Sequence, residues 1–197
     1  MARAELADAR WREAIAAAAE RLAAAGIESP QADARELAEC ALAGTPARVP
    51  ARAGEDDGAG LDAACEAEPF ASFAALVERR AAREPLQHIT GTMHFRFLEL
   101  ASRPGVFVTR PETEWMADLP IAEANRLVAA GQEPVVLDLC TGSGALALAV
   151  ATEAPGAKVW GVELSDAAYR LACENNARYD EPVAFVKGDA SMPVCIE

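Results

Sequence analysis

The chain has 197 residues, of which 52% are hydrophobic, and its formal net charge is −13 at pH 7. This length allows one large domain or two small ones, and so strong a negative charge argues against bulk nucleic-acid binding, which depends on neutralising phosphates. No apolar run approaches the roughly 18 residues that cross a bilayer. No signal peptide is expected, because acids stand among the arginines of the N-terminus and no long apolar core follows them.

The first part of the chain predicts a small helical bundle. Apolar residues at steps of mostly three and four indicate a helix over about residues 4–25. Ser29 and Pro30 are typical of the start of a second helix, and a third helix is expected to begin near Pro69. Between them, residues 46–64 are rich in proline, glycine and acid, which indicates an exposed loop. Such a bundle is either a stabilising cap or a module that recognises a partner or substrate.

A segment with proline and glycine punctuation follows the bundle. Alternation from Met93 to Leu100 and the short run 106–108 have strand character, and residues 103–105 between them predict the turn of a β-hairpin. A helix with an acidic first turn is expected after about residue 110. Pro120 should kink or divide that helix.

From Glu133 onward, strands and helices alternate. Apolar, Val-rich strands are expected over about 134–139, 158–163 and 183–187, with helices over about 144–153 and 166–178. This alternation predicts an α/β fold with a parallel sheet and right-handed crossovers.

The first of these strands leads into a glycine loop with the sequence Leu-Cys-Thr-Gly-Ser-Gly-Ala. Gly142 and Gly144 allow a ligand to approach the backbone without meeting a Cβ atom, and the helix start beyond them offers free N–H groups. An acid stands at or after the end of each strand, namely Asp138, Glu163 and Asp189. Because ligands of open α/β sheets bind beyond the carboxyl ends of the strands, all three acids are expected at one crevice.

The chemistry of these acids favours one cofactor over another. Glu163 can accept both hydroxyls of a ribose, and Asp189 can reach an adenine amino group. The loop also fits the G-x-G-x-x-A pattern of a nicotinamide dinucleotide site. However, Asp138 would repel a pyrophosphate, whereas it suits the ammonium group of S-adenosylmethionine. The residues therefore favour S-adenosylmethionine and leave the dinucleotide as the alternative.

Other chemistry is less well supported by the sequence. Five irregularly spaced cysteines without a Cys-x-x-Cys pair indicate neither a zinc site nor a disulfide framework, and their odd number fits a reducing, cytoplasmic compartment. His88 and His94 lack a third metal ligand nearby. Cys140 is interpreted as a small filler rather than a nucleophile. The arginines at 79, 80 and 83 are interpreted as a solvated helix face.

Several motifs in this order resemble the peptide chain release factor glutamine methyltransferases. They are the helical region, Arg-Glu-Pro-Leu-Gln-His-Ile-Thr-Gly at 83–91, the hairpin, Arg-Pro-Glu-Thr-Glu at 110–114, and the loop at 137–144. The resemblance implies a Rossmann-like class I methyltransferase sheet and S-adenosylmethionine as donor. It implies the glutamine amide of the Gly-Gly-Gln motif in a class-1 release factor as acceptor, with no membrane or nucleic-acid partner.

The same resemblance assigns residues and domains. The implied cofactor contacts are Asp138, Cys140, Thr141, Gly142, Ser143, Gly144, Glu163, Asp189 and Ala190, and no catalytic side chain is assigned. Cys140 replaces a glycine that is usual in the family, which is tolerable if its φ is negative. The implied parts are 1–83, a helical substrate-recognition domain; 84–111, a linker with the hairpin; and 112–197, the N-terminal part of the methyltransferase domain.

One departure from the family pattern limits the expected activity. The family's Asn-Pro-Pro-Tyr motif, which grips the substrate amide, does not occur in the sequence. We therefore expect a C-terminally truncated enzyme whose first strand lies at a sheet edge, which binds cofactor weakly and does not transfer methyl groups alone. The alternatives are an adenine-N6 nucleic-acid methyltransferase and a non-catalytic fragment whose bundle is a binding module.

Overall fold

The computed structural model describes Leu6, residues 8–44 and residues 69–192. Two compact units make up the chain, Met1–Gly91 and Thr92–Glu197. The loop expected at residues 46–64 lies outside the described residues. The functional roles assigned above to the three parts of the chain stay predictions.

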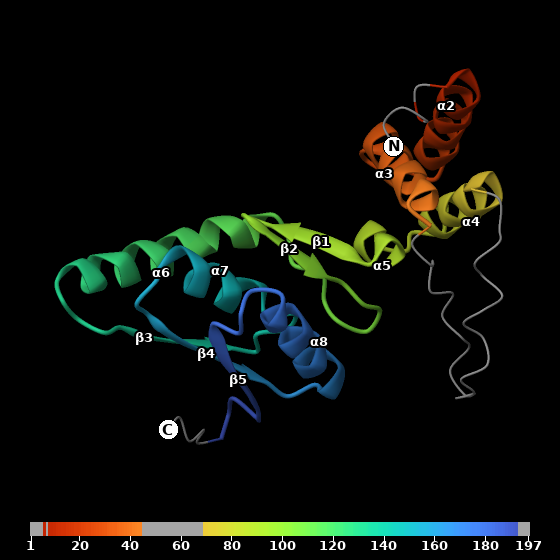
Figure 1. Ribbon diagram of the computed structural model, residues 1–197. Helices are drawn as coiled ribbons and strands as arrows, with labels where there is room; N and C mark the ends of the chain where they lie inside the picture. The colour runs from red at the N-terminus through yellow and green to blue at the C-terminus, as the bar shows by residue number, and fades with distance from the viewer. Residues whose placement is uncertain (1–5, 7, 45–68, 193–197) are drawn as a thin grey trace. The chain divides into compact units, whose positions relative to one another are not determined.

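The described part of the N-terminal unit contains four helices (Figure 1). They are α2 (Ala9–Ala24), α3 (Pro30–Leu42), α4 (Pro69–Ala81) and the short α5 (Leu86–Thr90). Three of them confirm the sequence prediction, and Asp8 caps α2 by accepting a hydrogen bond from the Arg10 N–H at 3.1 Å. Helix α5 was not expected. It is a single turn that ends at Gly91, whose φ of 77° stops the helix.

Aromatic and aliphatic side chains form the core of this unit. The Trp11 ring stacks on Phe70 at a centroid distance of 4.2 Å and meets Phe73 edge-on at 5.5 Å. Leu22 and Leu37 are fully buried beside them. Helix α2 is thus fixed on α3 and α4 by packing of its apolar side, as its periodicity predicts.

The basic cluster after α4 is not the solvated face that the sequence suggested. Arg79 pairs with Glu84, and Arg80 pairs with Asp33 at 2.7 Å and donates to the Glu84 carbonyl oxygen. Arg83 donates to the carbonyl oxygen of Gly26. Arg80 and Arg83 therefore connect the end of α4 to residues far away in sequence, whereas Arg79 binds the segment that directly follows its own helix.

The second unit begins with a β-hairpin, and its position corrects the sequence prediction. Strands β1 (Thr92–Phe95) and β2 (Leu98–Ala101) pair antiparallel, so the hairpin turn lies at residues 96–97 rather than 103–105. Residues 103–106 do form a turn, but no strand follows it. Arg96 lies in this turn with a φ of 53°. Its guanidinium binds Glu153 and Asp118, which fixes the turn to later parts of the chain.

Helix α6 (Glu112–Ala129) runs through Pro120 without interruption, although the sequence suggested a kink or a break. Proline removes the hydrogen bond that the carbonyl oxygen of Met116 would accept. Met116 is 67% exposed, so this side of the helix faces solvent and water can replace the missing donor.

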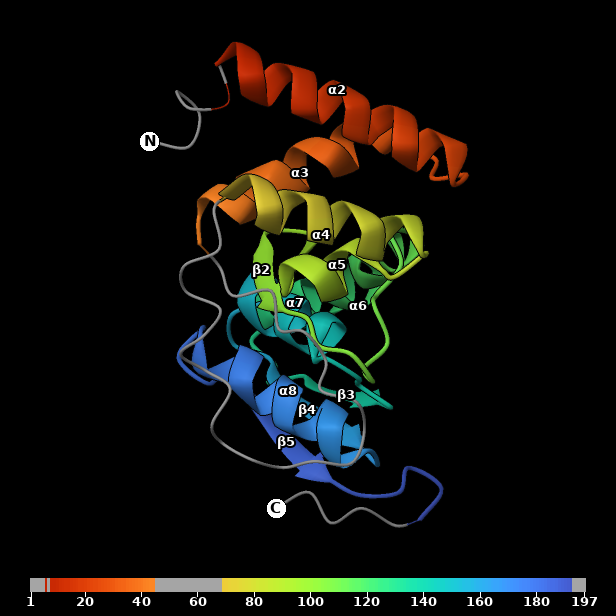
Figure 2. The ribbon, with the colours of Figure 1, turned by 90° about the vertical axis from the view of Figure 1, so that its right-hand side faces the viewer.

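A three-stranded parallel sheet confirms the predicted α/β fold. Its elements are β3 (Val135–Leu139), α7 (Ala145–Glu153), β4 (Lys158–Glu163), α8 (Asp166–Ala177) and β5 (Val183–Lys187), and the strand order is β3-β4-β5. Both crossovers run in the same direction across the sheet, so α7 and α8 cover the same face (Figures 1 and 2). This arrangement is a partial Rossmann-like fold.

The two faces of this sheet differ in burial. Val159 and Val183 lie in the core under the helices, together with the fully buried Leu148. On the other face, Val135, Leu137 and Leu139 are 61%, 41% and 49% exposed. Strand β3 has one partner in the described sheet, as expected for an edge.

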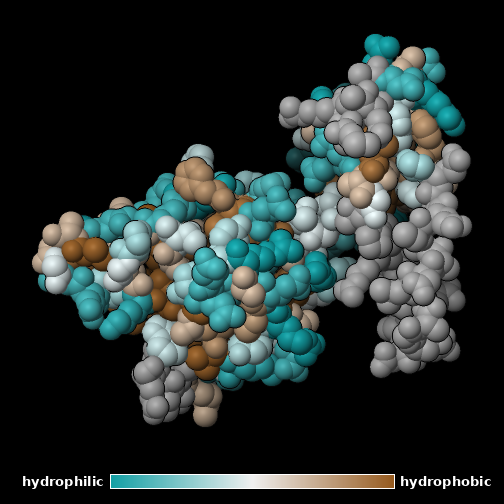
Figure 3. Space-filling view, viewed as in Figure 1, coloured by the Kyte–Doolittle hydropathy of each residue, from teal (hydrophilic) through white to brown (hydrophobic). Residues whose placement is uncertain are grey.

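Polar surface covers the outer side of α8. Figure 3 shows mainly hydrophilic residues over α8, which fits a helix with one apolar side turned to the sheet. None of the helices described for residues 8–44 and 69–192 combines the length and the hydrophobicity that a membrane span requires.

Candidate cofactor site

The glycine loop joins β3 to α7, and hydrogen bonds fix its path. The Thr141 N–H donates to the Val162 carbonyl oxygen at 3.1 Å, which ties the loop to β4. The Gly144 N–H donates to the Thr141 carbonyl oxygen at 3.0 Å. The loop is therefore a defined turn above the carboxyl end of the sheet, as the sequence pattern predicts.

Cys140 corrects one expectation about this loop. Its φ is 62°, not negative, and the residue is exposed. A left-handed conformation costs a non-glycine residue roughly 1–2 kcal/mol, because the Cβ atom approaches the neighbouring carbonyl oxygen. The loop thus has a backbone that suits glycine at this position, and the cysteine is held there against its preference.

The two glycines of the loop have different surroundings. A Cβ atom on Gly142, whose φ is 62°, would meet nothing within 4 Å, so its backbone faces open space that a ligand can enter. A Cβ atom on Gly144 would lie 2.8 Å from Phe185 Cζ and 3.4 Å from Ala172 Cβ. Gly142 therefore leaves room for a ligand, whereas Gly144 permits close packing of the loop on α8 and β5.

Asp138 lies half-buried at the end of β3 and organises the loop. Its Oδ2 accepts a hydrogen bond from Thr141 Oγ1 at 2.6 Å. Burial raises the pKa of the Asp138 carboxyl, which the hydrogen bond from Thr141 opposes and the nearby Glu163 reinforces. The site thus holds a carboxylate whose charge is incompletely compensated.

The Glu163 carboxylate accepts hydrogen bonds from two loops, the glycine loop and the loop that leads into α8. Its Oε2 accepts from the Gly142 N–H and its Oε1 from the Ser165 N–H, both at 2.8 Å, and the residue is only 9% exposed. Each carboxylate oxygen retains a lone pair after one such bond, so ribose hydroxyls can still donate to Glu163.

Asp189 lies beyond β5 and is exposed. Its Oδ1 accepts from the N–H of Ser191 at 2.8 Å and from the Ser191 Oγ at 2.7 Å. These bonds lower the pKa of the Asp189 carboxyl. Ala190 next to it is half-buried. The parallel register, in which Glu163 lies opposite Lys187, places both acids at the same edge of the sheet.

Sequence reasoning missed Asn175 in α8. This side chain is fully buried, and its Nδ2 donates to the Ser143 carbonyl oxygen at 3.0 Å on the inner side of the loop. The Oγ of Ser143 itself is buried without a partner among the described atoms. The available signal was the pair of asparagines at 175 and 176, which fall on the otherwise apolar side of a predicted helix.

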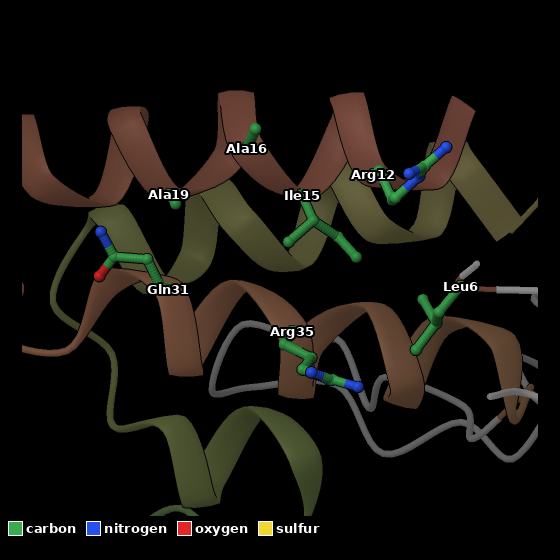
Figure 4. Close-up of a pocket in the computed structure, with 7 residues that line it drawn as sticks. All are labelled: Leu6, Arg12, Ile15, Ala16, Ala19, Gln31 and Arg35. Carbon is green, nitrogen blue, oxygen red and sulfur yellow. The ribbon is translucent and has the colours of Figure 1, made fainter. Parts of the chain in front are cut away.

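Possible binding sites away from the glycine loop are of two kinds, metal-ligand clusters and hollows. Within residues 6, 8–44 and 69–192, no group of three or more His, Cys, Asp and Glu is placed to hold a metal ion. A hollow of about 440 Å³ lies in the N-terminal unit between α2 and α3, with Ile15 projecting into it (Figure 4). Arg12 and Arg35 lie at its edges, so the hollow combines an apolar floor with positive charge.

Comparisons with known proteins give one family match in each of the two compact units. A family model described as the PrmC N-terminal domain matches residues 13–91, and one described as a methyltransferase domain matches residues 136–194. The chain is 45% identical over 161 residues to a release factor glutamine methyltransferase of Streptomyces coelicolor, which is 82% of this chain and 52% of that protein.

Other relatives carry the same name. In Deinococcus radiodurans the identity is 41% over 177 residues, covering 90% of this chain and 59% of the relative. In Mycolicibacterium smegmatis it is 42% over 184 residues, covering 93% and 59%. The chain therefore spans between half and three fifths of the length of these curated relatives.

Proposed function

The chain is a relative of the release factor glutamine methyltransferases, and from this premise we propose that it serves S-adenosylmethionine-dependent methylation of a release factor in translation termination. The acceptor is the side-chain amide of the Gly-Gly-Gln glutamine in a class-1 release factor. The observation that carries the proposal is the glycine loop with Asp138 and Glu163 beside the open space at Gly142.

In the proposed site, three acids lie at different parts of the cofactor. Asp138 attracts the ammonium group of the methionine part, and Glu163 accepts the ribose hydroxyls. Asp189 and Ala190 lie where the adenine binds. The loop residues 140–144 offer backbone groups to the cofactor, which when bound supplies the sulfonium methyl group. The role of the protein is then mainly orientation and electrostatics.

The same geometry disfavours a nicotinamide dinucleotide. The phosphates of such a cofactor would meet the glycine loop, where the Asp138 carboxylate already lies, bonded to Thr141. A second negative charge at that point is repelled. S-adenosylmethionine carries no phosphate and has a positive group for Asp138.

A protein acceptor is favoured over a nucleic acid. Arg79, Arg80 and Arg83 have intramolecular partners, so they do not form a free basic face for an adenine-N6 methyltransferase. We assign recognition of the release factor to residues 1–83, a connecting role to 84–111 and cofactor binding to 112–197, in a cytoplasmic setting. The alternative of a binding module without catalysis predicts release-factor binding without cofactor binding.

Calorimetry with S-adenosylhomocysteine and with NAD tests the cofactor assignment. We expect S-adenosylhomocysteine to bind at least about tenfold more tightly than NAD. Substitution Asp138→Asn should abolish this preference, because the carboxylate that attracts the ammonium group and repels a pyrophosphate is lost. Asp166→Asn, which removes an exposed acid paired with Lys187 outside the site, should leave the preference unchanged. Tighter binding of NAD would overturn the proposal.

Methyl transfer by the chain alone is expected to be at background level, since none of the described residues 8–44 and 69–192 is assigned to the acceptor amide. The measurement is incorporation of labelled methyl groups into purified release factor. A release factor with Gly-Gly-Ala in place of Gly-Gly-Gln is the control. Robust, glutamine-dependent turnover would refute the expected inactivity and support the methyltransferase assignment.

A further inference from the structure

Two side chains, one on α8 and one just beyond its end, bind the backbone of hairpin strand β2. They lie four residues apart in the sequence. The Tyr179 hydroxyl, just beyond the helix, accepts from the Glu99 N–H at 2.7 Å and donates to the Glu99 carbonyl oxygen at 3.1 Å. Asn175 accepts from the Ala101 N–H at 2.7 Å and donates to the Ala101 carbonyl oxygen at 3.3 Å. Each side chain thus makes the two backbone hydrogen bonds that a neighbouring strand would otherwise make with β2.

Asn175 differs from Tyr179 because it also reaches the glycine loop. Its Nδ2 donates to the Ser143 carbonyl oxygen, so one buried amide joins the hairpin edge to the loop. Both hydrogens of the amide and its oxygen are used, and the side chain is fully buried. It therefore contacts the inner side of the loop, away from any ligand.

The loop needs this donor because α7 does not use the Ser143 carbonyl oxygen. The first backbone bond of the helix runs from the Leu148 N–H to the Gly144 carbonyl oxygen, at 2.9 Å. Without Asn175, the Ser143 carbonyl oxygen would lose its donor inside a buried residue, at a cost of about 1–3 kcal/mol.

We propose that Asn175 is a positioning residue for the cofactor site. It holds the Ser143 carbonyl, and with it the path of the glycine loop that leaves the Gly142 backbone open to a ligand. The proposal rests on the proposed function, because its consequence is cofactor affinity. It goes beyond that function by assigning a role to a residue that touches no cofactor and by tying the loop to the hairpin.

The test compares Asn175→Ala with Tyr179→Phe, which removes hairpin hydrogen bonds but touches no loop residue. Calorimetry measures the Kd for S-adenosylhomocysteine, and hydrogen exchange of the ligand-free chain measures protection of residues 141–145. We expect Asn175→Ala to raise the Kd about tenfold, the size of one hydrogen bond, and to lower loop protection. Tyr179→Phe should change the Kd by less than about twofold.

Asn175→Asp gives a second variant, which keeps the acceptor for Ala101 but loses both donors, and it should show the same loss of loop protection. Equal effects of the Asn175 and Tyr179 substitutions, or unchanged Kd and loop protection in Asn175→Ala, would overturn the proposal. So would unfolding of both Asn175 variants while Tyr179→Phe folds, because the role would then lie in folding. Failure of the parent chain to bind S-adenosylhomocysteine refutes the proposed function, and loop exchange still decides the role of Asn175.

Discussion

At the scale of single residues, the cofactor loop combines backbone groups with acids that also bind the protein. Asp138 and Glu163 were expected as ligand contacts; Asp138 accepts from the Thr141 hydroxyl, and Glu163 accepts from two backbone N–H groups. The sequence could indicate these acids because each ends a strand. It could not indicate Asn175, since its importance comes from residues 32 and 74 positions away that only the folded chain brings near.

Cys140 provides a prediction about stability. Because its φ of 62° is unfavourable for any residue with a Cβ atom, Cys140→Gly should raise the free energy of unfolding by about 1 kcal/mol. Chemical denaturation of both chains measures the change. The control is Cys173→Ser, on α8 and outside the set of left-handed residues, which should bring no gain. Loss of stability in Cys140→Gly would show that the thiol contributes more than the backbone strain costs.

Asp138 gives a prediction about pH. Because burial raises its pKa, the folded chain binds this proton more tightly than the unfolded chain, and this contribution to stability falls as pH rises through the raised pKa. Asp138→Asn removes the effect and keeps an acceptor for the Thr141 hydroxyl. The variant should therefore be more stable than the parent chain at neutral pH, with the difference shrinking on acidification.

The same variant should bind S-adenosylhomocysteine about tenfold more weakly at neutral pH, since the ammonium group loses its counter-charge. Urea denaturation at several pH values and calorimetry are the two measurements. A stability difference that grows on acidification, or unchanged affinity, would contradict the assigned role of Asp138.

At the scale of elements, local pattern predicted the sheet and its helices and failed at the hairpin. The strands β3 to β5 are continuous apolar runs between helices, so their bounds follow from composition alone. The hairpin turn carries no glycine or asparagine, and the Arg103-Pro104-Gly105 sequence offered a stronger local signal. The true turn is decided by contacts of Arg96 with α6 and α7, which no local pattern shows.

Arg96 should accordingly be important for the stability of the second unit. It donates two hydrogen bonds to the Glu153 carboxylate, at 2.6 and 2.8 Å, and one to Asp118 at 2.7 Å. Arg96→Met should lower the free energy of unfolding by about 2–3 kcal/mol, because bonds to charged partners are lost. Arg126→Met, which removes an exposed pair with Glu123, should change it by less than about 0.5 kcal/mol. Similar effects of both substitutions in denaturation would contradict this assignment.

At the scale of the whole molecule, the described sheet has one covered and one open face. Parallel sheets are normally covered on both faces, because each strand is apolar on both sides. Here the helices protect Val159 and Val183, whereas Leu137 and its neighbours along β3 stay exposed. The cofactor loop is formed at the end of this same strand, so an exposed apolar surface adjoins the candidate site.

This open face predicts self-association of the isolated chain. Exposed apolar surface on a sheet edge favours contact between copies, so the apparent mass should rise with concentration in light scattering after size-exclusion chromatography, and a hydrophobic dye should bind. Leu137→Lys places a charge in the middle of the face and should reduce both signals. Leu164→Lys is the matched control, since Leu164 is 63% exposed but follows β4 outside the strands. A constant monomeric mass with no dye binding, or equal effects of the two substitutions, would show that this face does not associate.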